Sequence, residues 1–141
     1  MKAFLDTSVL VAAARESDLR HRVSRALMMH SDPQIACCAA HSLAELYSAL
    51  TGMRPPNRFR PEQAILVLDQ VRASLWCIPL SAEEVFQTVR QTSILKLPGG
   101  IIYDALLMAC ARKVDAERIY TWNQKHFRMV APDLSDRIMT P

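Results

Sequence analysis

The chain has 141 residues, of which half are hydrophobic and 22% are charged. This length suffices for one domain with its own core, which we expect over residues 1–141, and the composition excludes an intrinsically disordered chain. The net charge of +3 permits a polyanionic partner without requiring one. Asp6 interrupts any signal-peptide pattern, and no apolar run is long enough to span a bilayer. We therefore expect a cytoplasmic protein with no membrane partner.

Four short apolar segments predict buried strands, and a segment with helical spacing follows each of them. The predicted strands cover residues 3–5, 34–39, 76–80 and 118–121. Residues 128–130 are expected to form a last short strand, and residues 132–141 a loose tail. Because strands alternate with helices, the sequence predicts a three-layer α/β/α fold around a central parallel sheet of four or five strands.

The predicted helices cover residues 9–14, 17–31, 41–51, 61 to about 75, 81–93 and 101–111, and residues 124–127 are expected to form a short turn or helix. Ser81 and Glu84 fit a capping box that opens one of them, with Val85 and Val89 expected to face inward. Four cysteines lie in apolar stretches without any C-x-x-C spacing, which favours buried free thiols: Cys37, Cys38, Cys77 and Cys110. Cys37 and Cys38 should point to opposite faces of a strand. The four histidines are expected to be surface or packing residues.

Acidic side chains recur where predicted strands end and helices begin. Asp6 follows the first strand, Glu45 and Asp104 lie in first turns of helices, and Asn123 follows the fourth strand. Right-handed crossovers place all these junctions at one edge of a parallel sheet, so we expect the four side chains to meet there. Oxygen ligands of this kind suit Mg²⁺ or Mn²⁺ rather than zinc.

Helix capping accounts for the same residues locally. Asp6 is placed to cap the helix after it, and capping is slightly favoured for this residue from local sequence alone. Ser42 and Glu45 fit a capping box, and here the capping and ligand interpretations are even. Asp104 would also benefit from the helix dipole, although its apolar neighbours indicate a buried position.

A basic loop over residues 53–60 carries three arginines, one phenylalanine, two prolines and no acidic residue. Arg54, Arg58 and Arg60 could contact phosphates while Phe59 stacks on a base. An exposed linker explains the same composition unless the loop borders a site.

In chain order, four motifs resemble those of the PIN domain, and more narrowly those of VapC toxins from bacterial toxin–antitoxin pairs. These motifs are Leu-Asp6-Thr-Ser-Val, Ser42-x-x-Glu45, Tyr-Asp104-Ala-Leu and Thr121-Trp-Asn123-x-x-x-Phe127. The resemblance covers essentially the whole chain. It implies a metal-dependent endoribonuclease that hydrolyses RNA phosphodiester bonds, with Mg²⁺ or Mn²⁺ as cofactor. It further implies a cognate antitoxin and a homodimer.

By this resemblance, Asp6, Glu45 and Asp104 are the acidic, metal-binding catalytic set. Asn123 stands where many relatives carry a fourth acidic residue, and with Thr121 it would position water or substrate. Arg54, Arg58 and Arg60 are the expected RNA contacts.

Other classes of protein share parts of the pattern. A receiver-type phospho-acceptor or a haloacid-type phosphatase would use Asp6 as a nucleophile, but Asp6-Thr-Ser lacks the second acid of a D-x-D motif. A PIN-fold RNA- or protein-binding module with weak or no activity stays open, and Asn123 is the only feature that favours it.

Overall fold

The computed structural model describes residues 1–141 and contains one five-stranded sheet with strand order β3-β2-β1-β4-β5. All four neighbouring pairs are parallel, which confirms the predicted parallel sheet. The strands are β1 (Ala3–Leu5), β2 (Ala36–Ala39), β3 (Trp76–Ile78), β4 (Arg118–Tyr120) and β5 (Ile138–Met139).

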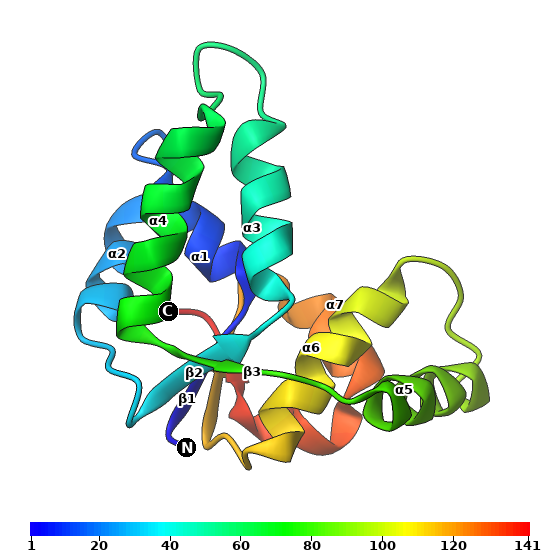
Figure 1. The fold of residues 1–141 in the computed structure, drawn as a ribbon. Helices are drawn as coiled ribbons and strands as arrows, with labels where there is room; N and C mark the ends of the chain where they lie inside the picture. Colours follow the sequence, from blue (N-terminus) through cyan, green and yellow to red (C-terminus); the bar gives the residue numbers. More distant parts are fainter.

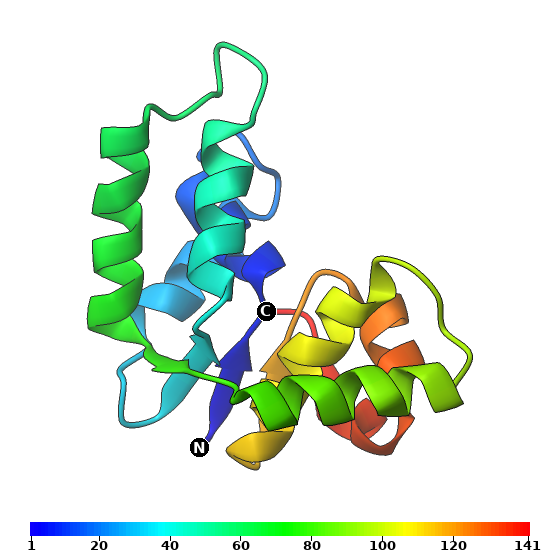
Figure 2. The same ribbon diagram turned by 45° about the vertical axis from the view of Figure 1, so that its right-hand side comes forward.

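Helices cover both faces of the sheet, which confirms the three layers (Figure 1). One layer contains α1 (Thr7–Ala14), α2 (His21–Met29), α3 (Ser42–Thr51) and α4 (Pro61–Ser74). The other contains α5 (Ala82–Ile94), α6 (Ile101–Lys113), α7 (Gln124–Val130) and the short 3₁₀ helix η1 (Pro132–Arg137). The turned view in Figure 2 shows the sheet running between these two groups.

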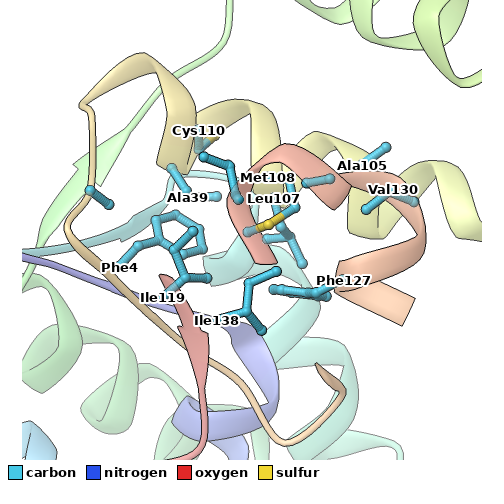
Figure 3. Packing of buried hydrophobic residues seen from close by; sticks show 14 of the residues in the cluster. Phe4, Ala39, Ala105, Leu107, Met108, Cys110, Ile119, Phe127, Val130 and Ile138 are labelled. Atoms are coloured by element: carbon cyan, nitrogen blue, oxygen red, sulfur yellow. The ribbon is translucent and has the colours of Figure 1, made fainter. Parts of the chain in front are cut away.

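Successive residues of a strand point to opposite faces of the sheet, so the strands contribute side chains to two separate cores. Phe4 packs with Ile119 and Phe127 in the core beneath α6 and α7 (Figure 3). Its neighbour Leu5 packs with Leu46 in the core beneath α1, α3 and α4. Cys37 and Cys38 divide between the two cores in the same way, and all four cysteines are free.

The C-terminal part differs from the prediction in two respects. Residues 128–130 continue helix α7 instead of forming a strand, because Phe127 and Val130 are buried at helical spacing. The predicted loose tail over 132–141 was also wrong, since it forms η1 and then β5 at the edge of the sheet. Ile138 of β5 is only 3% exposed.

Helix α5 is capped as predicted but packs through another face. The Glu84 N–H donates to Ser81 Oγ at 3.1 Å, which confirms the capping box. Val85 and Val89 are 37% and 44% exposed, so the prediction that they face inward was wrong. Thr92 is the buried residue of this helix, because α5 lies along the outer side of α6.

Other elements are shorter than predicted because they begin later in the chain. Helix α2 begins at His21 rather than Ser17, and β2 begins at Ala36 after a turn that includes Asp32. None of the helices combines the length and the apolar character that crossing a membrane requires.

Because β5 completes the core, Ile138→Ala should lower the free energy of unfolding by about 2–4 kcal/mol through lost burial and a cavity. Urea unfolding followed by circular dichroism measures this change. The matched control is Ile65→Ala on α4, where the side chain is 50% exposed and the cost should stay below about 0.5 kcal/mol. Equal costs for the two variants would mean that the C-terminal strand does not stabilise the fold.

Candidate functional site

The site lies at the point where the strand order reverses. Strand β1 pairs with β2 on one side and with β4 on the other, and the chain reaches β4 only after β2 and β3. In open parallel sheets, the carboxyl ends of strands at such a switch point border the ligand crevice. Leu5 pairs with Tyr120, so the next residues, Asp6 and Thr121, lie side by side at that edge.

Asp6 is a buried carboxylate held by two hydroxyl groups. The residue is only 3% exposed. Its Oδ2 accepts hydrogen bonds from Ser8 Oγ at 2.6 Å and from Thr121 Oγ1 at 2.8 Å. Burial raises the pKa of Asp6, while these two hydroxyl donors oppose the rise. Asp6 occupies the N-cap position of α1, as the capping interpretation expected, but the structure gives it no side-chain capping hydrogen bond.

Glu45 does not form the capping box either. The N-cap of α3 is His41, and the Ser42 hydroxyl oxygen accepts a hydrogen bond from Thr7 Oγ1 at 3.0 Å. Glu45 Oε1 is buried without a hydrogen-bond partner, and the imidazole Nε2 of His41 lies 3.7 Å from it. Burial raises the pKa of Glu45, and the negative charges of Asp6 and Asp104 raise it further, against the effect of the Thr7 hydroxyl.

Asp104 lies in the first turn of α6 and faces the same region. Burial and the charge of Asp6 raise the pKa of Asp104, and the imidazole of His126 opposes the rise. His126 Nδ1 is 3.5 Å from Asp104 Oδ2 and 2.9 Å from Asn123 Nδ2. The structure therefore places the Asn123 side chain on His126, which in turn contacts Asp104, and not on Asp6. Sequence reasoning treated His126 as an ordinary surface residue and missed this contact.

The charge of Asp6 raises the pKa values of Glu45 and Asp104, and the charge of Asp104 raises the pKa of Glu45. No three carboxylate, imidazole or thiol groups lie close enough to share one metal ion as they stand. The donor set nevertheless fits a hard divalent cation, because all three groups offer oxygen and Glu45 Oε1 lacks a partner. Holding such an ion would require the side chains of Glu45 and Asp104 to move toward Asp6.

The basic loop lies away from these carboxylates. Residues 53–60 join the outer ends of α3 and α4 (Figure 1), whereas Glu45 is in the first turn of α3. From Glu45 to the end of α3 at Thr51 the helix rises about 9 Å, at 1.5 Å per residue. Within the loop, Arg58 Nε donates to Met53 O at 2.9 Å, and Arg60 pairs with Glu62 at 3.2 Å. The loop can therefore meet only a substrate that extends well beyond the carboxylates.

The sequence profile of the PIN domain matches residues 3–131. The chain belongs to the PIN domain family. This PIN domain is similar in structure to Mycobacterium tuberculosis VapC20, a sarcin–ricin loop cleaving toxin, with a TM-score of 0.71. Their sequences are 19% identical, over 89% of this chain and 92% of that chain.

It is also similar to Rickettsia felis VapBC2, solved bound to a DNA fragment from its promoter, with a TM-score of 0.64. Here the identity is 23%, over 91% of this chain and 92% of the other. No curated protein matches the sequence. At these identities the likeness establishes a shared fold, and the VapC neighbours agree with the resemblance seen in the sequence.

Asp104→Asn should raise the free energy of unfolding of this PIN domain at pH 7 in metal-free buffer. The fold raises the pKa of Asp104 above its ordinary 3.8, so ionisation costs the folded state more than the unfolded chain. That cost is absent below pH 3.8 and is fully present above the folded-state pKa. The gain from the variant should therefore shrink as the pH falls from 7 toward 3.8.

Urea unfolding at several pH values measures this gain. Asp69→Asn on the exposed side of α4 is the matched control, and it should show no comparable change with pH. A variant that is less stable than the wild type at pH 7 would contradict the electrostatic account of Asp104.

Proposed function

We propose that this PIN domain is an endoribonuclease that hydrolyses RNA phosphodiester bonds with a divalent cation, Mg²⁺ or Mn²⁺. The observation that carries the proposal is a buried Asp6 at the switch point of the sheet, with Glu45 and Asp104 near enough for all three charges to interact. The structural neighbour VapC20, a sarcin–ricin loop cleaving toxin, supports the same reaction class.

In this proposal Asp6, Glu45 and Asp104 hold the cation. When bound, Mg²⁺ or Mn²⁺ acts as a Lewis acid that polarises a phosphoryl oxygen and eases the deprotonation of water. Ser8 and Thr121 hold the Asp6 carboxylate in place, because both hydroxyls donate to it. Thr121 is fully buried, so its role is to hold Asp6 rather than to touch RNA directly.

In this proposal the remaining polar groups of the site contact the attacking water and a phosphate of the RNA. The unpartnered Oε1 of Glu45 is a free acceptor that can orient a water molecule for attack on phosphorus. Asn123 and His126 lie beside Asp104 and can donate to a phosphate oxygen from that side. Asn123 therefore remains in the proposed catalytic set, with a neutral side chain that adds no charge to the site.

We further propose that the protein acts in the cytoplasm as the toxin of a toxin–antitoxin pair, with a cognate antitoxin and a homodimeric state. The VapBC2 neighbour, a toxin–antitoxin complex by its name, supports an antitoxin partner. The alternative is a PIN-fold RNA- or protein-binding module with weak or no activity. Two observations favour that alternative: Asn123 replaces an acid, and no three ligands converge in the structure.

Replacing the acidic residues tests the nuclease proposal. Asp6→Asn, Glu45→Gln and Asp104→Asn should each lower the rate of RNA cleavage by roughly 100-fold or more, since metal-based stabilisation contributes several kcal/mol. Gel analysis of cleaved RNA in Mg²⁺ or Mn²⁺ buffer measures the rate, and EDTA should abolish it. The control Asp69→Asn should cleave like the wild type. Full activity in EDTA, or normal cleavage by Asp104→Asn, would refute the metal-site assignment.

The basic loop is tested by the salt dependence of RNA binding. Arg54, Arg58 and Arg60 are proposed to contact phosphates of an extended RNA, so each lost contact should flatten the slope of log K against log salt by about 0.7. Arg58→Ala with Arg60→Ala, measured in the Asp104→Asn background to prevent cleavage, gives the change. Arg90→Ala on α5, in the other helical layer, is the control. A slope identical to that of the background protein would remove the loop from the RNA-binding face.

A further inference from the structure

The two hydroxyls that hold Asp6 are themselves oriented by neighbouring main-chain groups. The Trp122 N–H donates to Ser8 Oγ at 3.0 Å, and the Asn123 N–H donates to Thr121 Oγ1 at 2.9 Å. A backbone N–H can only donate, so each hydroxyl oxygen acts as its acceptor. The single proton of each hydroxyl is thereby directed at Asp6 Oδ2.

This arrangement distinguishes the two oxygens of the Asp6 carboxylate. Oδ2 receives both hydrogen bonds, from Ser8 and from Thr121, and a carboxylate oxygen has two lone-pair sites. Oδ1 accepts neither of these two hydroxyl hydrogen bonds. Ser8 and Thr121 together therefore make the two oxygens of Asp6 unequal toward a cation.

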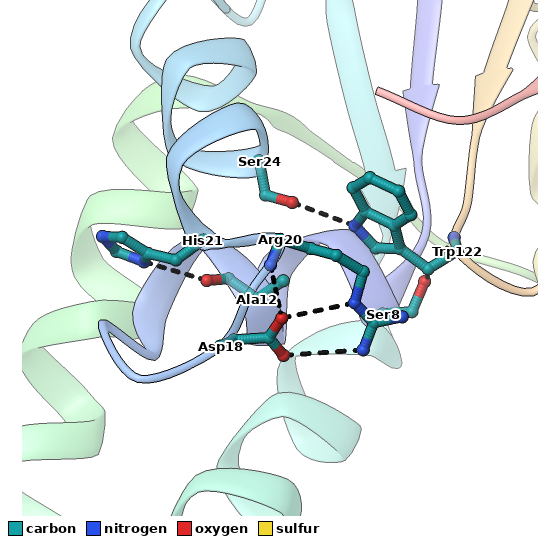
Figure 4. A network of polar contacts seen from close by, with 7 residues as sticks. All are labelled: Ser8, Ala12, Asp18, Arg20, His21, Ser24 and Trp122. Atoms are coloured by element: carbon teal, nitrogen blue, oxygen red, sulfur yellow. Dashed lines mark hydrogen bonds and ion pairs between the residues drawn. The ribbon is translucent and has the colours of Figure 1, made fainter.

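The side chain of Trp122 is fixed from the far side by the start of α2 (Figure 4). Its Nε1–H donates to Oγ of the fully buried Ser24 at 2.9 Å. The guanidinium of Arg20 lies 5.3 Å from the centre of the indole ring, a cation–π distance. Asp18 holds that guanidinium in turn, through Arg20 Nε at 3.2 Å.

Helix α2 is also tied to the helix that carries Ser8. His21 Nδ1 makes a 3.0 Å hydrogen bond with Ala12 O of α1 (Figure 4). The residues around Trp122 thus form one connected set of polar contacts between α1, the start of α2 and the segment after β4.

The geometry points to Trp122 as a positioning residue for the cation site: its indole, held by Ser24 and Arg20, fixes the amide that orients Ser8 and so presents Asp6 Oδ1. This inference rests on the proposed function, because it assigns a role in binding the cation. It makes α2, a helix that contributes no carboxylate, a determinant of metal affinity.

Calorimetric titration with Mn²⁺ tests the inference on the full chain, with thermal unfolding measured on the same samples. Ser8→Ala should weaken Mn²⁺ binding about tenfold, the usual effect of removing a group that orients a metal ligand. Ser8→Thr keeps the hydroxyl and should restore the affinity. Trp122→Phe and Ser24→Ala remove the indole hydrogen bond from either side, and each should weaken binding roughly threefold.

The control is Ser31→Ala, whose hydroxyl donates only to Leu27 O at 2.8 Å near the end of α2, and whose Mn²⁺ affinity should match the wild type. If Trp122→Phe and Ser24→Ala lower the unfolding temperature but keep wild-type affinity, Trp122 is merely structural and the inference is overturned, while the nuclease proposal stands. If the wild type itself shows no Mn²⁺ affinity, the metal-dependent nuclease proposal fails and the inference fails with it.

Discussion

The hydrogen bonds of the candidate site depend on one buried carboxylate at the end of the middle strand of the sheet. Asp6 is 3% exposed, and such a group is costly unless hydrogen bonds or a counter-charge offset its desolvation. The pairing of β1 with β4 brings Thr121 to it from 115 residues away, and the first turn of α1 brings Ser8. The parallel sheet therefore does more than bury apolar side chains, since its register supplies the two donors that the carboxylate needs.

The other two acids add to this cost instead of relieving it. Glu45 and Asp104 face the same edge, and burial together with the charge of Asp6 raises the pKa of each. The basic side chains within 4 Å of them are two imidazoles, His126 at 3.5 Å from Asp104 and His41 at 3.7 Å from Glu45. Buried like charges lower the stability of the fold, and they are typical of functional sites, where a bound ligand balances the unfavourable charge. A divalent cation is the ligand that matches three oxygen donors of the same sign.

The sequence was sufficient for the parts of the fold that depend on local periodicity. Alternating apolar strands and amphipathic helices predicted the parallel sheet, both helical layers and the junctions that carry Asp6, Glu45 and Asp104. It could not decide between capping and ligand roles, because Ser42 and Glu45 have capping-box spacing whether or not the box forms. Strand β5 was missed because its two residues are too few to show a period, and their burial depends on contacts with β4. Trp122 and His126 were missed for a related reason, since their partners Ser8, Ser24 and Asp104 are distant in sequence.

The central claim is that Asp6, Glu45 and Asp104 bind one divalent cation between them. The most direct measurement is a crystal structure of the protein soaked in Mn²⁺, with diffraction data collected at the manganese absorption edge. The account predicts one anomalous peak at the carboxyl ends of β1 and β4, bonded to Asp6 Oδ1 and to Asp104, with Glu45 drawn toward it. A well-ordered soaked crystal with no peak there, or with Mn²⁺ bound only elsewhere, would contradict the account.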